Sequence, residues 1–333
     1  MNNKFKIQAL LNYNEDKKME KIEKDLPGKP MEEPPMDISK IAKLPTGLIK
    51  FFFKVGIKKI RGQMGGESKD ITTRTITTED KIISGYKSDV RIRIYKPEEK
   101  GKRPLMVFFH GGGWFGGSLW AVEEYCKGVC DQADCVVISV EYHLAPEHPY
   151  PEGLEDSYLA VKWAVDNKSE LNIDENKIIV SGDSAGGNFA AVLTLIAKER
   201  KEFTITKQIL IYPATTMMFS GETNEDSPVV SGMKKFNKVI SNIYTKGKVD
   251  PSDPYISPLM AKDFKNQPDA LIAVGDQDFL YKSSLEYAKK LDEAGNKVKF
   301  ILYKNANHAF IDDTGNSEQA DDLVREASEF IRS

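Results

Sequence analysis

A serine flanked by small residues is the clearest candidate for chemistry in this sequence of 333 residues. The serine lies at the centre of a short motif made of Gly182, Asp183, Ser184, Ala185 and Gly186. An apolar segment precedes the motif and a helical pattern follows it, which predicts a strand, a tight turn and a helix. The two glycines leave room for a strained turn. Such a turn would expose the hydroxyl as a nucleophile and point helix amides at the negative charge that its attack creates.

A second motif could stabilise that negative charge. It consists of His110, Gly111, Gly112, Gly113 and Trp114, directly after an apolar segment. Glycines let the backbone approach a substrate carbonyl closely and turn N–H groups toward it. A phosphate-binding loop would carry a lysine and a hydroxyl residue after its last glycine. The tryptophan at this position instead suits an apolar acyl or alcohol group.

The sequence leaves a single candidate for the general base. Enzymes that place a serine on such a turn carry the acid, and then the histidine, after the serine in the chain. Of the four histidines, His308 alone follows Ser184. It lies in a predicted loop just after the apolar segment 300–303, from which its imidazole could reach the serine.

Two carboxylates compete for the position of the acid. Asp276 and Asp278 both follow the apolar segment 270–274 and both lie between Ser184 and His308. Either could accept the imidazole N–H and hold the histidine in the tautomer that removes the serine proton. Residue types and spacing leave this choice open.

Alternating strands and helices are predicted to position these residues. The continuous apolar segments that predict buried strands are 105–109, 136–140, 178–180, 209–212, 270–274 and 300–303. Helical patterns separate most of them, for example 155–165 and 284–294. This alternation indicates a mainly parallel sheet with helices on both faces. The alternating pattern of residues 90–95 predicts antiparallel strands at the edge of the sheet.

The N-terminal part of the chain has a different composition, rich in Lys, Glu and Pro. Prolines between residues 27 and 35 would break a long helix there. Segment 44–60 mixes apolar residues with lysines and predicts one or two amphipathic helices. Because Pro45 and Gly56 would interrupt a long membrane-surface helix, we expect this segment to pack over the catalytic domain.

Composition excludes several classes of function. The net charge of -3 provides no broad positive field for nucleic acid. No apolar run reaches about 18 residues and the first residues lack the apolar core of a secretory signal. We therefore expect a cytoplasmic protein without stable membrane insertion. Cys126, Cys130 and Cys135 lack a further Cys or His ligand at zinc-site spacing, so we expect buried thiols and no metal.

Four motifs together resemble those of the hormone-sensitive lipase family of carboxylesterases, in the α/β-hydrolase superfamily. They are the glycine loop 110–114, the segment 142–149, the serine motif 182–187 and the histidine motif 307–310. The resemblance runs from about Tyr95 to the C-terminus. It implies an α/β-hydrolase fold, with a mainly parallel central sheet flanked by helices and a helical cap.

The resemblance also favours one of the two acids. The family's acid belongs to an Asp-Pro-Leu motif, which Asp278, Phe279 and Leu280 match except at the middle position. This similarity favours Asp278 over Asp276. A second departure is His143, which stands where the family usually has arginine.

Further roles follow from the same resemblance. It implies that the backbone N–H groups of Gly112, Gly113 and Ala185 donate to the oxyanion. It also implies a cap formed by N-terminal helices in residues 1–60 and an insertion at 215–248, over a catalytic domain that spans 70–333.

These inferences predict a serine carboxylesterase that hydrolyses short- to medium-chain esters through an acyl-enzyme, without a cofactor. The expected partner is a small-molecule ester, and a homodimer and an amide substrate remain open. One alternative is an interfacial lipase for longer-chain lipids that uses the apolar residues 51–57. The other is a non-catalytic receptor, which would usually keep the serine turn and lose the histidine or the acid.

Overall fold

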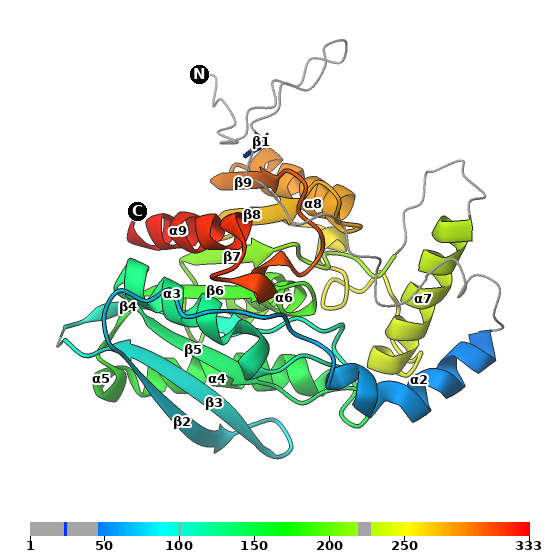
Figure 1. Cartoon of the computed structure of the whole chain (residues 1–333), viewed down its shortest axis with the longest axis horizontal. Coiled ribbons are helices and arrows are strands. Elements are labelled where there is room, and N and C mark those ends of the chain that lie inside the picture. The colour runs from blue at the N-terminus through cyan, green and yellow to red at the C-terminus, as the bar shows by residue number, and fades with distance from the viewer. Residues whose placement is uncertain (1–22, 25–45, 100, 219–227) are drawn as a thin grey trace, which may run out of the picture.

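One mixed sheet organises the chain in the computed structural model, which describes residues 23–24, 46–99, 101–218 and 228–333 (Figure 1). Within these residues, nine strands follow the order β1-β9-β8-β7-β6-β4-β5-β3-β2. The strands are β1 Glu23–Lys24, β2 Ile76–Ser84, β3 Asp89–Pro97, β4 Arg103–Phe109, β5 Val136–Glu141, β6 Ile173–Asp183, β7 Lys207–Ile211, β8 Asp269–Gly275 and β9 Val298–Tyr303. All neighbours pair in parallel except β2 with β3 and β3 with β5.

The predicted apolar segments coincide with the strands from β4 to β9. Residues 105–109 of β4 and 270–274 of β8 are fully buried, which explains why these strands carry almost no polar side chains. Burying each large apolar side chain stabilises the fold by about 1.5–3 kcal/mol. At one end of the sheet the predicted antiparallel strands are present, with β2 outermost and β3 between β2 and β5.

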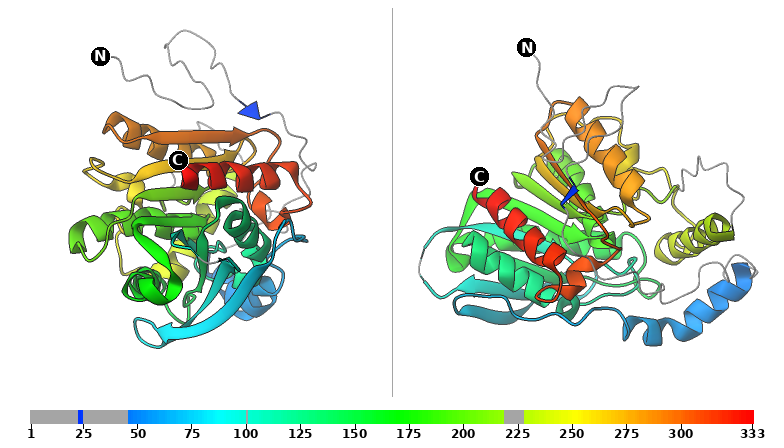
Figure 2. Two further views of the ribbon diagram at one scale, coloured as in Figure 1. Left: turned by 90° about the vertical axis from the view of Figure 1, so that its left-hand side faces the viewer. Right: turned by 45° about the horizontal axis from the view of Figure 1, so that its top comes forward.

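Helices cover both faces of the sheet, as the alternating pattern predicted (Figure 2). They are α2 Thr46–Arg61, α3 Glu123–Ala133, α4 Glu152–Asp166, α5 Lys168–Leu171, α6 Ala185–Arg200, α7 Pro228–Thr245, α8 Tyr281–Glu293 and α9 Glu318–Arg332, with short 3-10 helices η1 Leu119–Val122, η2 Pro258–Met260 and η3 Phe310–Asp313. The helices α3 and α9 pack together on one face, and α4, α6 and α8 lie on the other. The three cysteines are free and buried, as expected.

Two helices lie side by side away from the sheet, namely α2 and α7 (Figures 1 and 2). Helix α2 is continuous through Gly56 and begins directly after Pro45. On α7, Val239, Ile240 and Tyr244 are buried. Most of the segment 1–45 and residues 219–227, where parts of the expected cap fall, lie outside the described residues. Within the first of these segments, the two residues of β1 pair with β9.

None of the helices in the described part of the chain combines the length and the apolar content that a membrane span requires.

Candidate active site

Ser184 occupies a strained turn between β6 and α6. Its backbone has φ 51° and ψ −112°, a region that costs a residue with a side chain about 1–3 kcal/mol. A Cβ on Gly182 would lie 2.4 Å from the carbonyl carbon of Gly186, and one on Gly186 would lie 1.9 Å from the Phe109 oxygen. The turn therefore requires glycine at both positions. The Ser184 amide donates to the carbonyl of Ile211 at 2.9 Å, which anchors the turn to β7.

A hydrogen-bonded chain links the serine to a histidine and a carboxylate. His308 Nε2 lies 2.9 Å from Ser184 Oγ, and its Nδ1 lies 2.8 Å from Asp278 Oδ2. The Asp278 side chain is fully buried, and its second oxygen accepts the N–H of Leu280 at 2.7 Å. If Nδ1 carries the proton that the carboxylate accepts, Nε2 has a free lone pair that faces the serine hydroxyl.

The other candidate acid, Asp276, points elsewhere. Its N–H donates to the carbonyl of Tyr303 at 2.9 Å, and within the described residues its buried Oδ1 has no hydrogen-bond partner. The N–H of Asp278 bonds to the carbonyl of Gly275, where β8 ends, at 3.2 Å. This turn brings the later aspartate, and not the earlier one, to His308.

The surroundings of His308 favour its charged form. Burial by itself lowers the pKa of the imidazole, but the charge and the hydrogen bond of Asp278 outweigh this effect, so the pKa lies above its ordinary value. Two aromatic rings flank the imidazole, Tyr212 at 4.8 Å and Phe279 at 4.6 Å between centroids. Phe279 is 53% exposed, so it presents an apolar surface beside the histidine. Sequence patterns placed Tyr212 only at the end of the apolar segment 209–212 and did not indicate its contact with His308.

The glycine loop lies next to the serine turn because β4 and β6 are neighbours in the sheet. Gly112 has φ 115° and Gly113 has φ 61°, and a Cβ on Gly112 would lie 2.3 Å from the Gly116 carbonyl carbon. The N–H of Gly111 donates to Asp183 Oδ1 at 2.6 Å. The residue before Ser184 therefore ties the glycine loop to the serine turn.

Comparison with known proteins assigns the family. The profile of a family described as alpha/beta hydrolase fold matches residues 106–312, well over half of the chain. The chain belongs to the α/β-hydrolases. Within that superfamily it is a member of the family that resembles hormone-sensitive lipase, as the four motifs indicated. The predicted fold class is thereby confirmed.

Several relatives of this α/β-hydrolase carry names of esterases. The chain is 36% identical over 245 residues to the carboxylic ester hydrolase LipN of Mycobacterium tuberculosis. The match covers 71% of this chain and 65% of LipN, so the chain spans just under two thirds of that relative. It is 31% identical to an arylesterase of Saccharolobus solfataricus, over 74% of this chain and 81% of the relative. The crystal structure of an esterase from Pyrobaculum calidifontis shares 30% identity with a TM-score of 0.71, over 89% of this chain and 95% of that one.

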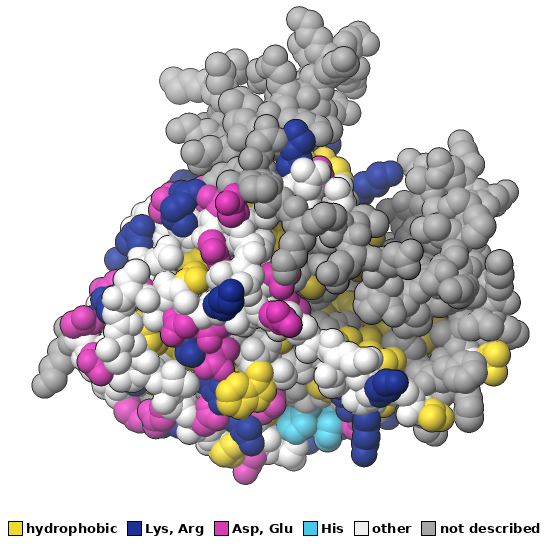
Figure 3. All heavy atoms as spheres, in the orientation of Figure 1, with side chains coloured by type: hydrophobic (Ala, Val, Ile, Leu, Met, Phe, Trp, Pro, Cys, Tyr) yellow, Lys and Arg dark blue, Asp and Glu magenta, His cyan; other side chains and the backbone are white. Residues whose placement is uncertain are grey.

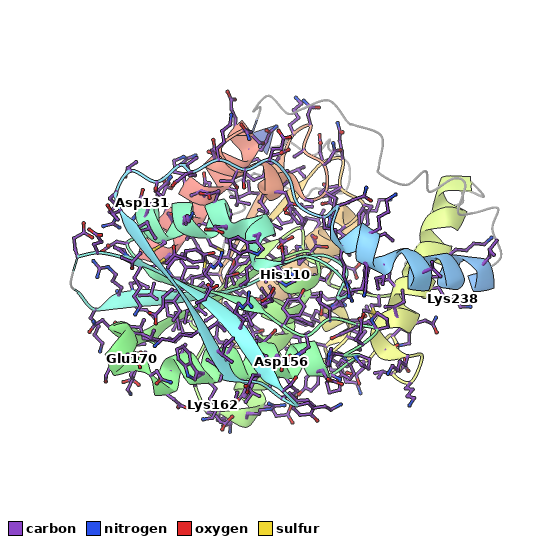
Figure 4. The ribbon with its side chains drawn as sticks, turned by 60° about the horizontal axis from the view of Figure 1, so that its bottom comes forward. His110, Asp131, Asp156, Lys162, Glu170 and Lys238 are labelled. Carbon is purple, nitrogen blue, oxygen red and sulfur yellow. The ribbon has the colours of Figure 1, made fainter. Side chains whose placement is uncertain are left out.

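His110, labelled in Figure 4, has a structural place in this α/β-hydrolase, and the hydrogen bonds from Ser184 lead to His308 and Asp278 instead. It is buried, its Nδ1 lies 2.8 Å from the carbonyl oxygen of Gly111, and its ring stacks on Tyr142 at 4.3 Å. Burial lowers the pKa of this imidazole to about 4, so it is neutral near pH 7. The ring therefore supports the glycine loop from within.

Trp114, which was expected beside an apolar acyl or alcohol group, is almost completely buried. The side chain is 5% exposed and stacks on Tyr244 of α7 with 4.9 Å between the ring centroids. The last residue of the motif therefore joins the glycine loop to α7.

Asp183 carries an unusual carboxyl. Burial raises its pKa to about 7, although the Gly111 N–H and the charge of His308 act in the opposite direction. Burial and the charge of Asp183 likewise raise the pKa of Asp312 well above the ordinary value. The carboxyl that accepts the Gly111 N–H therefore has a pKa well above its ordinary value.

Sequence reasoning missed Arg61, the last residue of α2. Its Nε donates to the carbonyl of Phe115 at 2.5 Å, and its Nη2 donates to the carbonyl of Ala145 at 2.9 Å. The same guanidinium pairs with Glu147 at 2.7 Å and lowers the pKa of that carboxyl. Arg61 therefore connects α2 to the end of the glycine loop and to the loop after β5.

Among the described residues, no group of three or more His, Cys, Asp or Glu side chains is arranged to hold a metal ion.

Proposed function

We propose that this α/β-hydrolase is a serine carboxylesterase, with Ser184 as nucleophile, His308 as general base and Asp278 as the acid that orients the base. The observation that carries the proposal is the unbroken chain of hydrogen bonds from Ser184 Oγ through both nitrogens of His308 to Asp278. That order of contacts is the one that nucleophilic catalysis by serine requires. The esterase names of the relatives support the same reaction class.

The mechanism follows from these contacts. Ser184 Oγ attacks the ester carbonyl carbon while His308 Nε2 takes the hydroxyl proton. The buried carboxylate of Asp278 stabilises the imidazolium that forms. The imidazolium then protonates the leaving alcohol, which leaves an acyl group on the serine. Water attacks this acyl-enzyme by the same route and releases the carboxylic acid.

The oxyanion would be held by the backbone N–H groups of Gly112, Gly113 and Ala185. The first two lie in the loop that Asp183 holds beside the serine turn, and Ala185 opens helix α6. Amides fixed in this way need no reorganisation when the charge develops, and each contributes about 10²–10³ in rate. The proposed chemistry uses no cofactor.

We propose that α2 and α7 are parts of a cap, with N-terminal helices in residues 1–60 and an insertion at 215–248 over a catalytic domain at 70–333. The contacts of Arg61 with the loops and the stacking of Trp114 on Tyr244 support this division, since each couples one of the two helices to the glycine loop.

We further propose short- to medium-chain esters as substrates. The test is hydrolysis of 4-nitrophenyl esters from acetate to palmitate by the wild type and by Ser184→Ala. Turnover of the short esters that is lost in the variant would support the proposal. Activity only above the concentration at which a long-chain ester aggregates would favour an interfacial lipase. A folded wild type without activity on any ester would contradict the esterase and favour a receptor.

A further inference from the structure

A second hydrogen-bonded serine, histidine and aspartate lie outside the site described above. Ser88 Oγ lies 2.8 Å from His143 Nε2, and His143 Nδ1 lies 2.7 Å from Asp156 Oδ2. The three residues come from the turn between β2 and β3, from the loop after β5 and from α4. Both the order of the contacts and the distances repeat those of Ser184, His308 and Asp278.

The carboxylate of this second chain is well placed to fix the imidazole. The Asp156 side chain is 1% exposed, and its two oxygens accept the backbone N–H groups of Tyr86 at 2.8 Å and of His143 at 3.1 Å. Backbone donors thus fix both oxygens of the side chain, and Oδ2 lies where it can accept the proton on Nδ1 of the ring. The lone pair of Nε2 is thereby directed at the Ser88 hydroxyl.

The turn that carries Ser88 is held close to α4, where Figure 4 labels Asp156. A Cβ on Gly85 would lie 2.4 Å from the Ser88 carbonyl oxygen and 2.7 Å from Asp156 Oδ1, so only glycine allows this approach. The Gly85 amide also donates to the Ser88 carbonyl at 3.1 Å. Ser88 itself is exposed, and histidine side chains reach the surface on the face shown in Figure 3.

Neighbouring groups restrict the imidazole further. The ring of His148 lies 4.4 Å from that of His143, and its Nδ1 lies 2.9 Å from Glu152 Oε2. Glu152 also pairs with Lys87 at 2.7 Å. The side chain of His143 is therefore held between a buried carboxylate and a second ordered ring, while its Nε2 faces an exposed hydroxyl.

We propose that Ser88 is a second, solvent-facing nucleophile that accepts acyl groups from activated esters. Ser88 Oγ attacks the carbonyl carbon of a phenolic ester while His143 Nε2 takes the hydroxyl proton. The bond from the carbonyl carbon to the phenolic oxygen breaks, the phenolate leaves, and the imidazolium passes its proton to water. The product is an O-acylserine at position 88, which water can later hydrolyse.

The range of acyl donors follows from what surrounds Ser88. Ser184 lies at the N-terminus of α6 and beside the glycine loop, whereas Ser88 lies on a hairpin turn. The hairpin offers no helix N-terminus to the developing oxyanion, and each missing donor costs about 10²–10³ in rate. Ser88 therefore reacts with esters that have good leaving groups and leaves ordinary alkyl esters intact.

The experiment uses the full chain with Ser184→Ala, so that its result does not depend on the proposed esterase activity. The protein is incubated with 4-nitrophenyl acetate, and peptide mass spectrometry follows acetylation over time. We expect acetyl to accumulate on Ser88 faster than on Ser252, an exposed serine whose hydroxyl donates to Asp250 at 2.8 Å and which therefore serves as an internal control. Hydroxylamine should remove this acetyl, because it cleaves the serine ester and spares an amide on Lys87.

Two further variants test the role of the imidazole. His143→Gln removes the base, and we expect the acetylation rate of Ser88 to fall by about 10² or more. His143→Arg can still pair with Asp156 but has no nitrogen that accepts a proton, so we expect the same loss with the hairpin retained. Thermal unfolding checks that each variant is folded.

Three outcomes would overturn the proposal. The first is a Ser88 that is acetylated no faster than Ser252. The second is an acetylation rate that does not change in either folded His143 variant. The third is an acetyl group that resists hydroxylamine and maps to Lys87.

Discussion

The serine turn at Ser184 and the hairpin at Ser88 contain the same three side-chain types at nearly the same distances. The serine–histidine contacts are 2.9 Å and 2.8 Å, and the histidine–aspartate contacts are 2.8 Å and 2.7 Å. The backbones differ. Ser184 has a positive φ, directly precedes helix α6 and lies beside a glycine loop, whereas Ser88 lies on a turn between two antiparallel strands. The comparison separates two requirements, namely side chains placed to activate a hydroxyl and fixed amides placed to stabilise an oxyanion.

The two histidines should separate the sites most strongly. His308→Gln removes the base next to Ser184, and we expect kcat for a short ester to fall on the order of 10⁶. His143→Gln is the matched change at the hairpin and should leave this turnover unchanged. Steady-state kinetics with 4-nitrophenyl acetate measures both. Similar losses in the two variants would mean that the sites are not independent.

The aspartates come next in expected effect. Asp278→Asn removes the charge that orients His308, and we expect a loss in kcat of about 10⁴. Asp276→Asn should retain activity, because the imidazole is hydrogen-bonded to Asp278, and Oδ1 of Asp276 has no hydrogen-bond partner among the described residues. The same kinetic assay, with circular dichroism to confirm folding, compares them. The assignment of the acid fails if Asp276→Asn is the more damaging substitution.

The glycines test the difference in backbone directly. Gly112→Ala places a Cβ at φ 115° and against Gly116, so the oxyanion loop must shift, and we expect kcat to fall by about 10²–10³. Gly85→Ala disturbs the hairpin instead, and it should lower the Tm while kcat is retained. An active Gly112→Ala variant would contradict the role of this loop.

The smallest expected effect is a shift in pH dependence. Burial lowers the pKa of His308, but the charge and the hydrogen bond of Asp278 raise it by more, so the pKa lies above the ordinary imidazole value of 6.5. The base must be neutral, so the acid limb of kcat/KM should lie above that value, and weakening the charge with Asp278→Asn should move the limb to lower pH.

The same shift has a consequence for stability. Because the pKa of His308 is higher in the folded protein than in the unfolded chain, binding of a proton to His308 stabilises the fold. This stabilisation is complete at a pH below the unfolded-state pKa, and it is lost as the pH rises through the folded-state pKa. The difference in Tm between wild type and His308→Gln, measured from about pH 5 to about pH 9, should therefore shrink as pH rises. A difference that grows would contradict the direction of the shift.

Local patterns predicted much of this molecule. Each strand from β4 to β9 contains a continuous apolar segment, and such segments, alternating with helical patterns, are typical of buried parallel strands. The serine turn was predictable because only glycines fit beside it. His308 was identified because no other histidine follows Ser184.

Contacts between distant elements were not predictable in the same way. Spacing alone left Asp276 and Asp278 open, since the choice depends on a hydrogen bond from Asp278 to Gly275 that turns one side chain toward the histidine. Ser88 and His143 are 55 positions apart in sequence, and no local pattern shows that the hairpin meets the loop after β5. Arg61 likewise gains its role only where α2 ends beside Phe115.

The position of Arg61 determines where the N-terminal segment of a relative can be joined to this chain in a chimaeric protein. One guanidinium at the end of α2 bonds to the carbonyls of Phe115 and Ala145 and to the carboxylate of Glu147. Grafting the N-terminal segment of a relative onto this protein would replace most of helix α2, and a junction placed before residue 61 would keep these bonds. A junction placed after residue 61 would exchange helix α2 together with the bonds that support the glycine loop in a single step.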